Sequence, residues 1–350
     1  MLKTNALARL RAHQSPDVRN RSITMERVRR VYVILARDKD LRDKFDAFVE
    51  DLAELRDGEA SQERAERLEA NMFILLAPSG AGKSRALRRL FEKHPLTQGY
   101  GDRDSDCPII SVVCPSPCSM VDLGREILKE TGWEPTRQQI RAPALWRMVR
   151  RRLQEMGVVI LHLDELQHAP QSLNAVEQQK LRNALKAMLV DLEHPIGLVI
   201  SGMPEIEPFI HPDRQVARRG YWLGFERLAM PGDIKAVSST VRKMAEVAAL
   251  DVAPDIERTL IPRLVHAGCH QMGIVCEEIH DAIRYALRHQ TGPLTIESFA
   301  SAYAFRTNSL ERWNPYLAQN YRAVDPTKTM MRRDPPPAEP TSKARKGRKA

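Results

Sequence analysis

The chain has 350 residues, of which 43% are hydrophobic and 5% aromatic, and its formal net charge is +9. This length predicts one large or two small domains, and the low aromatic content favours Leu- and Ala-rich helices over a β-sandwich. No segment reaches the roughly 18 apolar residues of a membrane span, and the N-terminus lacks the apolar region of a signal peptide. We therefore expect a cytoplasmic protein with no membrane partner.

The positive charge favours a polyanionic partner, most simply nucleic acid. Much of the excess lies from Thr327 onward, so a basic tail on an otherwise neutral protein is the alternative. Five cysteines without a CxxC pair indicate a reducing compartment. A zinc site built on Cys107, Cys114 and Cys118 would need a fourth ligand, and none has the expected spacing.

The first 60 residues are expected to form an N-terminal helical region. Apolar residues recur at helical spacing over 24–55, and Asp57-Gly58-Glu59 breaks this pattern. A short helix over 60–70 is then expected to lead into an apolar strand over 72–76.

A Gly-rich octapeptide follows this strand and opens into a helix that begins near Arg85. Its residues are Ala77, Pro78, Ser79, Gly80, Ala81, Gly82, Lys83 and Ser84. Strand, glycine loop and helix in this order predict a P-loop, because backbone N–H groups and the helix N-terminus attract phosphate. We expect the octapeptide and Arg85 to bind a nucleotide, with Lys83 on the β- and γ-phosphates and Ser84 on Mg²⁺. Ala77 replaces the usual first glycine, and a Gly-rich turn without a ligand is the alternative.

Three further apolar strands alternate with helices. The strands are expected over 108–113, 158–163 and 196–200, and the helices over 119–131, 142–156 and about 171–193. Such alternation predicts an α/β fold with a parallel sheet flanked by helices.

From about Pro231 onward the pattern is entirely helical. The expected helices cover 232–249, 254–266, 272–289 and 295–304. The predicted domains are an N-terminal helical region (1–60), an α/β core (61–230), a helical lid (231–310) and a largely disordered basic tail (311–350).

Two carboxylates follow the strand over 158–163, as in a Walker B motif. Such a pair is costly at the end of a buried strand unless it binds a cation or performs chemistry. We expect Asp164 to hold Mg²⁺ and Glu165 to polarise the attacking water, and a helix-capping Asp164 is the alternative. Ser201, at the tip of the next strand, is a candidate γ-phosphate sensor, unless it only ends that strand.

A pair of arginines, Arg218 and Arg219, lies beyond this sensor strand. An arginine supplied to a neighbouring subunit can stabilise charge on the transferred phosphoryl group. The sequence does not choose between the two, and a solvated basic turn is the alternative.

Two basic segments are candidates for DNA contact. The predicted helix over 142–156 carries three arginines at spacings that place them on a shared face, and Arg137 and Arg141 precede it. The three are Arg147, Arg150 and Arg151. The second candidate is 116–129, which contains Arg125 and Lys129. Repeated copies in an oligomer would contact phosphates without reading sequence, and a solvated face is the alternative.

The order of these motifs resembles the AAA+ ATPases and, more narrowly, the TniB/TnsC group of transposition ATP-binding proteins. The residues that carry the resemblance are PSGAGKSRALRRL (78–90), HLDELQHA (162–169), LVISGMPE (198–205), QVARRGYWLGFERL (215–228) and HAGCHQMGIVCEEIHDAIRYAL (266–287). It spans roughly 20–310 and implies an AAA+ P-loop NTPase with a C-terminal helical lid and with ATP and Mg²⁺ as cofactors. It also implies a ring or helical filament on duplex DNA that recruits or activates a transposase, with a target-selection protein as a further candidate partner.

One departure from the wider AAA+ pattern concerns the lid. Where many members carry a sensor arginine, this chain has Gly268-Cys269-His270-Gln271. We therefore expect slow hydrolysis that acts as a switch for disassembly. The alternatives are an ATPase that loads a helicase or remodels a protein, and a nucleotide-binding scaffold without hydrolysis, against which Asp164 and Glu165 argue.

Overall fold

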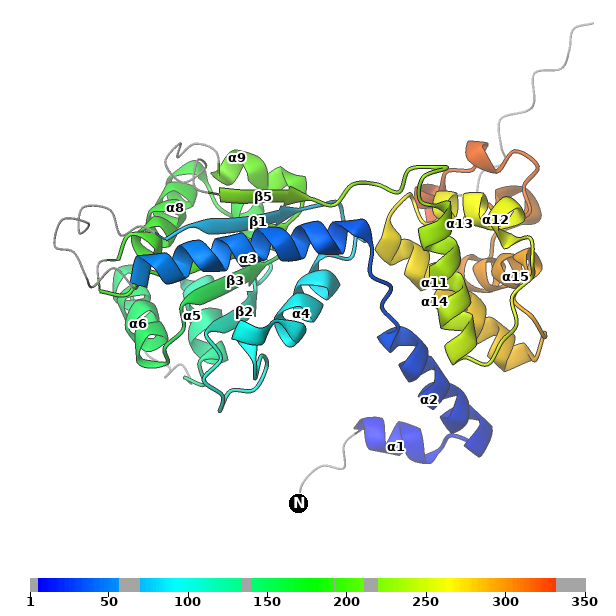
Figure 1. The fold of residues 1–350 in the computed structure, drawn as a ribbon, viewed down its shortest axis with the longest axis horizontal. Coiled ribbons are helices and arrows are strands. Elements are labelled where there is room, and N and C mark those ends of the chain that lie inside the picture. The colour runs from blue at the N-terminus through cyan, green and yellow to red at the C-terminus, as the bar shows by residue number, and fades with distance from the viewer. Residues whose placement is uncertain (1–5, 57–69, 134–139, 192, 211–219, 332–350) are drawn as a thin grey trace, which may run out of the picture. The chain divides into compact units, whose positions relative to one another are not determined.

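The chain divides into two compact units, shown with their elements in Figure 1. The computed structural model describes residues 6–56, 70–133, 140–191, 193–210 and 220–331. The sheet unit contains residues 32–229 and 271–274, and the helical unit contains residues 1–31, 230–270 and 275–350. The predicted N-terminal region, 1–60, is therefore divided between the units. Among the described residues no helix is both long and apolar enough to cross a membrane.

Five parallel strands form the centre of the sheet unit, in the order β2-β3-β4-β1-β5. They are β1 (Met72–Leu76), β2 (Ile109–Val113), β3 (Ile160–Asp164), β4 (Gly197–Gly202) and β5 (Gly220–Gly224). The predicted parallel sheet is confirmed, and edge strand β5 is an addition, because its short, half-buried Gly-Tyr-Trp-Leu-Gly sequence carries a weak strand signal. Since all five strands run in one direction, their carboxyl ends share one edge, the carboxyl edge.

Helices cover both faces of this sheet. They are α3 (Ala36–Arg56), α4 (Lys83–Lys93), α5 (Met120–Glu130), α6 (Ala142–Glu155), α7 (His168–Ser172), α8 (Ala175–Leu189) and α9 (Glu207–Ile210), with short turns η2 (Pro95–Thr97) and η3 (Pro204–Ile206). Right-handed crossovers place α4 on one face and α5, α6 and α8 on the other. The ring of Phe45 in α3 lies 5.6 Å from that of Phe91 in α4 and 6.1 Å from that of Phe73 in β1. Helix α3 therefore lies in the same layer as α4.

Two predicted helices are each interrupted. The helix expected over 24–55 is two helices, α2 (Pro16–Arg30) and α3. The residues between them, 31–35, are five consecutive apolar or aromatic residues and lack helical periodicity. The carboxylate of Asp38 accepts a hydrogen bond from the N–H of Leu35 at 2.7 Å and so caps the start of α3. The helix expected over 171–193 is broken at Asn174, whose side chain accepts a hydrogen bond from Glu177 N–H and starts α8. In both places a side-chain cap competes with helix continuation.

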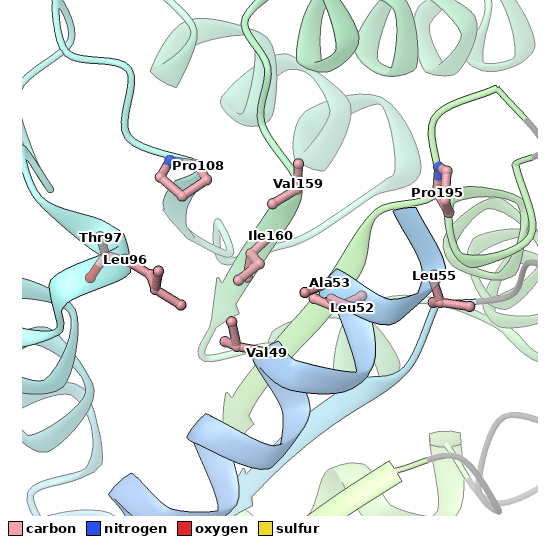
Figure 2. Close-up of a pocket in the computed structure, with 10 residues that line it drawn as sticks. All are labelled: Val49, Leu52, Ala53, Leu55, Leu96, Thr97, Pro108, Val159, Ile160 and Pro195. Atoms are coloured by element: carbon pink, nitrogen blue, oxygen red, sulfur yellow. The ribbon is translucent and has the colours of Figure 1, made fainter. Parts of the chain in front are cut away.

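An apolar cavity of about 200 Å³ lies at the edge of the sheet opposite the carboxyl edge (Figure 2). Its lining residues are Val49, Leu52, Ala53, Leu55, Leu96, Thr97, Pro108, Val159, Ile160 and Pro195. None of them is charged, so no ionised side chain lines this cavity to bind a phosphate or a cation. Charged and polar groups that could bind a nucleotide gather instead at the carboxyl edge.

The helical unit is all-helical, as predicted. It contains α1 (Ala6–Ala12), α2, α11 (Ile234–Val247), α12 (Ile256–Thr259), α13 (Ile261–Ala267), most of α14 (Met272–His289) and α15 (Ile296–Thr307), then η4 (Glu311–Trp313), η5 (Tyr321–Ala323) and η6 (Pro326–Met331). Residues 311–331 therefore do not belong to a disordered tail. Tyr316 is fully buried within this stretch and Arg263 donates to the carbonyls of Pro315 and Ala318. Buried aromatic area and these hydrogen bonds offset the ordering entropy.

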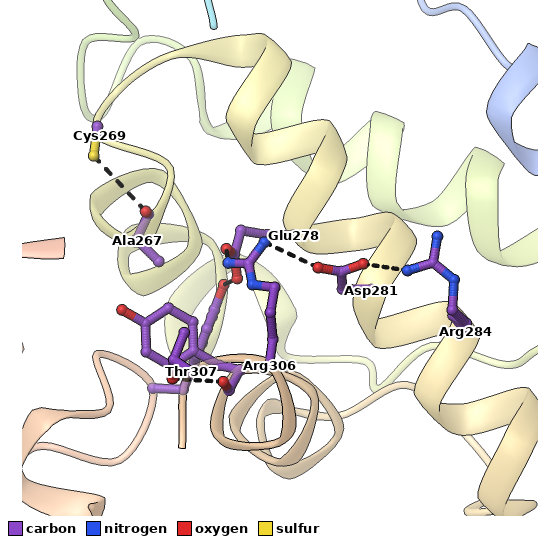
Figure 3. Close-up of polar contacts among 9 residues, drawn as sticks. Ala267, Cys269, Glu278, Asp281, Arg284, Arg306 and Thr307 are labelled. Carbon is purple, nitrogen blue, oxygen red and sulfur yellow. Dashed lines mark hydrogen bonds and ion pairs between the residues drawn. The ribbon is translucent and has the colours of Figure 1, made fainter. Parts of the chain in front are cut away.

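A buried carboxylate joins α14 to this C-terminal stretch (Figure 3). Glu278 is 4% exposed, accepts a hydrogen bond from Tyr316 at 3.1 Å and pairs with Arg306 of α15. Arg306 also reaches Asp281 at 2.9 Å, and Asp281 pairs in turn with Arg284. Burial raises the pKa of Glu278 above its usual value despite the opposing effect of Arg306.

Candidate nucleotide-binding site

The P-loop connects β1 to α4 at the carboxyl edge. Gly80 and Gly82 have φ angles of 78° and 92°, in the left-handed region that favours glycine. Ala77 is buried, lies outside that region and donates to the carbonyl of Gly202 at 3.2 Å. A β-carbon therefore fits at the first position of the motif, which explains why the usual glycine is dispensable here.

Lys83 lies at the centre of this loop. Its ammonium donates to the carbonyl oxygens of Ala77 at 2.8 Å and Pro78 at 3.3 Å, and the residue is 5% exposed. Burial lowers the pKa of Lys83 from its usual value, and the charges of Glu165 and Asp164 oppose that shift. Among the described residues the hydrogen-bond partners of this buried ammonium are carbonyls, and such a cation is suited to an anionic ligand.

The remaining predicted phosphate ligands differ in exposure. Ser79 and Ser84 are exposed, Pro78 and Arg85 are partly exposed, and Ala81 is buried and donates from its N–H to the carbonyl of Pro78 at 3.2 Å. The exposed Ser84 hydroxyl lies in the first turn of α4, directly after Lys83. It is therefore available to a cation or a ligand.

Asp164 ends β3 and is 8% exposed. Its Oδ1 atom accepts a hydrogen bond from the Ser201 hydroxyl at 2.5 Å and from the Glu165 N–H at 3.0 Å. No hydrogen bond from the described part of the chain reaches Oδ2. The carboxylate is therefore held on one oxygen and open on the other, which fits the oxygen donor that Mg²⁺ prefers.

Glu165 has a φ angle of 58°, a left-handed conformation that a residue with a β-carbon seldom adopts. Its carboxylate accepts a hydrogen bond from the side chain of Gln167, which is 3% exposed. Gln167 accepts in turn from the backbone N–H of Met203 at 3.2 Å. An unusual backbone conformation held by neighbouring contacts is typical of functional positions. Gln167 lies within the HLDELQHA segment, but its orienting contact was not expected from the sequence.

The predicted sensor, Ser201, is fully buried. It lies between Asp164 and His162, whose Nε2 atom is 2.8 Å from the Ser201 hydroxyl. The hydroxyl is therefore directed at the carboxylate, and a role toward the γ-phosphate stays a prediction. His162 was not singled out in the sequence, although an ionisable side chain inside an apolar strand is a signal that could have found it.

Aromatic and basic side chains from the start of the sheet unit lie beside α4. The guanidinium of Arg89 stacks 4.6 Å from the ring centroid of Tyr32, and that of Arg85 lies 5.7 Å from it. Arg37 stacks 4.3 Å from the ring of Phe225 and comes within 3.5 Å of a β-carbon placed on Gly82. No sequence motif marks Tyr32 or Arg37, because their proximity to the P-loop depends on the path of the chain between α2 and α3.

Two of the predictions, the arginine supplied to a neighbouring subunit and the basic segment around α6, lie wholly or partly outside the described residues. Arg218, Arg219 and Arg137 are not among those the structure describes. Within the described ranges no group of three His, Cys, Asp or Glu side chains is arranged to hold a metal ion.

The predicted DNA-contacting residues lie on α5 and α6. Arg147 is exposed, Arg150 lies 3.7 Å from Asp191, and Arg151 lies 2.9 Å from Glu155. On α5, Lys129 pairs with Glu126 at 3.1 Å, and Arg125 is partly exposed. Three of the five cations already have carboxylate partners, so phosphate contact would exchange one anion for another. Of the α6 arginines, Arg147 is the one that is exposed and has no carboxylate partner among the described residues.

A protein-family model described as bacterial TniB protein matches residues 32–231, more than half of the chain and nearly the limits of the sheet unit. No curated protein sequence matches. Among solved structures, the chain is similar to Cdc6p from Pyrobaculum aerophilum (TM-score 0.58, 13% identity, 80% of this chain and 70% of that one). It is also similar to the Aeropyrum pernix ORC1 protein in complex with DNA (TM-score 0.55, 18% identity, 79% of this chain and 66% of that one). A third similar structure is ORC2 of the same organism in ADPNP-ADP complexes (TM-score 0.51, 15% identity, 81% of this chain and 74% of that one). At these identities the similarity establishes the fold alone, which is that of the AAA+ P-loop NTPases.

Proposed function

The chain belongs to the TniB family, and from this premise we propose that it is an AAA+ ATPase that binds duplex DNA with ATP and regulates DNA transposition. The observation that carries the proposal is the convergence of the P-loop with Asp164 and Glu165 at the carboxyl edge. Strand β4 links the two elements: Ala77 N–H of the P-loop donates to the carbonyl of Gly202, and the Ser201 hydroxyl donates to Asp164. An ammonium, an exposed hydroxyl and two carboxylates are the groups that Mg²⁺-assisted phosphoryl transfer requires.

In the proposed reaction each group has a separate role. When ATP binds, the Lys83 ammonium would donate hydrogen bonds to oxygens of the β- and γ-phosphates in place of the two loop carbonyls. Ser84 and the open Oδ2 of Asp164 are suited to hold Mg²⁺, which when bound would neutralise charge on the phosphates. Glu165 orients and polarises the attacking water, and Gln167 fixes the direction of its carboxylate. Ser201, whose hydroxyl donates to Asp164, would respond to the γ-phosphate indirectly, through that carboxylate.

Assembly is the second part of the proposal. We expect ATP-bound subunits to form a ring or filament on duplex DNA, with Arg218 or Arg219 completing the neighbour's site. The assembly would recruit or activate a transposase, and a target-selection protein is a further partner. Slow hydrolysis would then permit disassembly, consistent with Gly268-Cys269-His270-Gln271 where a sensor arginine is common. A cytoplasmic location agrees with this function.

Nucleotide and DNA binding can be tested together. We expect the wild type to bind duplex DNA more tightly with ATP than with ADP, and Lys83→Ala to lose that difference. Glu165→Gln should abolish turnover but retain ATP-dependent oligomers, visible by electron microscopy. DNA binding that ignores both the nucleotide and Lys83→Ala would contradict the proposal.

The position of DNA can be tested on α6. Arg147→Ala should weaken DNA binding. The slope of the logarithm of the binding constant against the logarithm of salt concentration should become smaller by about 1, as expected for the loss of one phosphate contact. Arg258→Ala is a matched control, because Arg258 is exposed but lies in the helical unit. Equal effects of the two changes would remove α6 from the interface.

The alternative is an ATPase that loads a helicase or remodels a protein, in which the basic tail alone meets nucleic acid. Truncation after residue 331 separates these functions without removing Val324, whose carbonyl accepts a hydrogen bond from His266 at 2.7 Å. Loss of all DNA binding on truncation would favour the alternative. Retained ATP-dependent assembly on DNA would favour transposition.

A further inference from the structure

A chain of hydrogen-bonded side chains crosses the sheet unit and ends on Asp164. It begins at Tyr100, whose hydroxyl lies 2.6 Å from that of Ser111 in β2. The Ser111 hydroxyl lies 2.8 Å from Nδ1 of His162 in β3, and Nε2 of His162 lies 2.8 Å from the Ser201 hydroxyl in β4. Register pairs Ser111 with His162 directly. The neighbouring strands β2 and β4 each contribute one member, Ser111 and Ser201, and β3 between them contributes His162 and Asp164.

The direction of every proton in this chain follows from its last member. An ionised carboxylate only accepts, so the single hydroxyl proton of Ser201 is directed at Oδ1 of Asp164. The Ser201 oxygen must then accept from His162, which requires a proton on Nε2. In the neutral imidazole the other nitrogen, Nδ1, is then an acceptor for Ser111, and Ser111 in turn accepts from Tyr100. All five groups are satisfied by one consistent arrangement.

From this arrangement we propose that His162 is a positioning residue for the metal site, acting through Ser201 to hold Oδ1 of Asp164 and leave Oδ2 for Mg²⁺. The inference rests on the proposed ATPase function and adds to it a residue that touches neither nucleotide nor metal. Groups that orient a metal ligand from behind affect metal affinity and activity by about 10- to 100-fold in general.

The surroundings of His162 distinguish this role from simple core packing. His162 is 4% exposed, and its neighbours along β3, Leu161 and Leu163, are fully buried apolar residues. An apolar side chain would fill the same space without the cost of desolvating an imidazole. Its ring also packs 5.3 Å from that of Phe91, which limits its rotation. Both ring nitrogens are nevertheless hydrogen-bonded along the line that leads to Asp164.

Three substitutions distinguish the contribution of Nε2 of His162, which contacts Ser201, from that of Nδ1, which contacts Ser111. In His162→Gln, the amide nitrogen can take the place of Nε2 and still donate to Ser201. In His162→Asn, the shorter amide can accept from Ser111 but does not reach Ser201. His162→Phe keeps the ring and removes both contacts. Unfolding curves for each variant report whether it is folded.

The readout is the Mg²⁺ concentration that gives half-maximal ATPase activity. We expect it to rise about 10-fold in His162→Asn and His162→Phe and to stay within about 2-fold of the wild type in His162→Gln. Ser111→Ala, a half-buried and milder change, should shift it in the same direction by a smaller factor. Equal responses of the Gln and Asn variants, or no response in any variant, would overturn the inference.

A measurement without nucleotide gives a second test. Nitrogen chemical shifts of the ¹⁵N-histidine-labelled wild type should identify His162 as protonated on Nε2 and not on Nδ1, with assignment from the signal that His162→Gln removes. A ring protonated on Nδ1 would overturn the inference even if the protein is an active ATPase. A wild type that neither binds nor hydrolyses ATP would instead count against the proposed function, and the tautomer would still be decided.

Discussion

The side chain of Gln167 donates a hydrogen bond to the carboxylate of Glu165 from two residues further along the chain. The same amide accepts from Met203 N–H at 3.2 Å, so it ties the candidate catalytic base to the end of β4. Glu165 itself has a positive φ angle, and the hydrogen bond from Gln167 is the side-chain contact among the described residues that orients its carboxylate.

Removal of this contact should slow turnover more than it weakens nucleotide binding. We expect Gln167→Leu to lower kcat by about 10- to 100-fold and to leave KM for ATP within about 2-fold, because it misplaces the base without altering the P-loop. Steady-state ATPase assays test this. Gln179→Leu, a change at an exposed glutamine of α8, should leave kcat unchanged, and similar losses in both variants would refute the role of Gln167.

Gly202 provides the space that Gln167 occupies. A β-carbon at Gly202 would lie 2.6 Å from the Gln167 side-chain oxygen, and the side chain would have to move. We expect Gly202→Ala to lower kcat in the same way and to add little in combination with Gln167→Leu. Gly224→Ala is the matched control, since its nearest neighbour is the Leu76 carbonyl at 3.7 Å. Additive losses in the double variant would show that the two residues act separately.

Burial of His162 predicts a pH-dependent stability. Desolvation lowers the pKa of His162 from 6.5 to about 4, so between these values the unfolded chain binds a proton and the folded protein does not. The free energy of unfolding must then fall as the pH drops through this window, by about 3 kcal/mol from this group. Urea unfolding of the wild type and of His162→Phe should show this difference between pH 7 and pH 4. Parallel pH profiles of the two proteins would contradict it.

Arg306 and Arg284 offer a matched pair in the helical unit. The two side chains are similarly exposed, 41% for Arg306 and 47% for Arg284, but Arg306 compensates the buried Glu278, whereas the partner of Arg284 among the described residues is the less buried Asp281. We expect Arg306→Ala to cost about 2 kcal/mol, because it leaves a buried carboxylate uncompensated, and Arg284→Ala to cost less than about 1 kcal/mol. Glu278→Gln should recover part of the loss in the Arg306→Ala background. Urea unfolding measures the two single variants and the double variant, and equal costs for the two arginines would be evidence against the burial argument.

The sequence alone determined the features that depend on neighbouring residues. The apolar strand before Ala77, the glycines at Gly80 and Gly82, and the carboxylates after the strand over 158–163 each have a local pattern with a known physical cause. The parallel sheet followed from the alternation of such patterns. Helix ends were less predictable, because capping by Asp38 and Asn174 competes with periodicity.

Only the tertiary structure decided which distant side chains meet. Strand register brings Ser111, His162 and Ser201 into one hydrogen-bonded line, although 51 and 39 residues separate the successive pairs. Likewise, Tyr316 orders the stretch predicted as a tail, because its buried ring packs against Phe299 and Tyr303 and its hydroxyl donates to Glu278. Periodicity reports whether a side chain faces a core, but its hydrogen-bond partner depends on the register and the path of the whole chain. For that reason the carboxylate of Asp164 could be predicted from the sequence, and the residues that orient it could not.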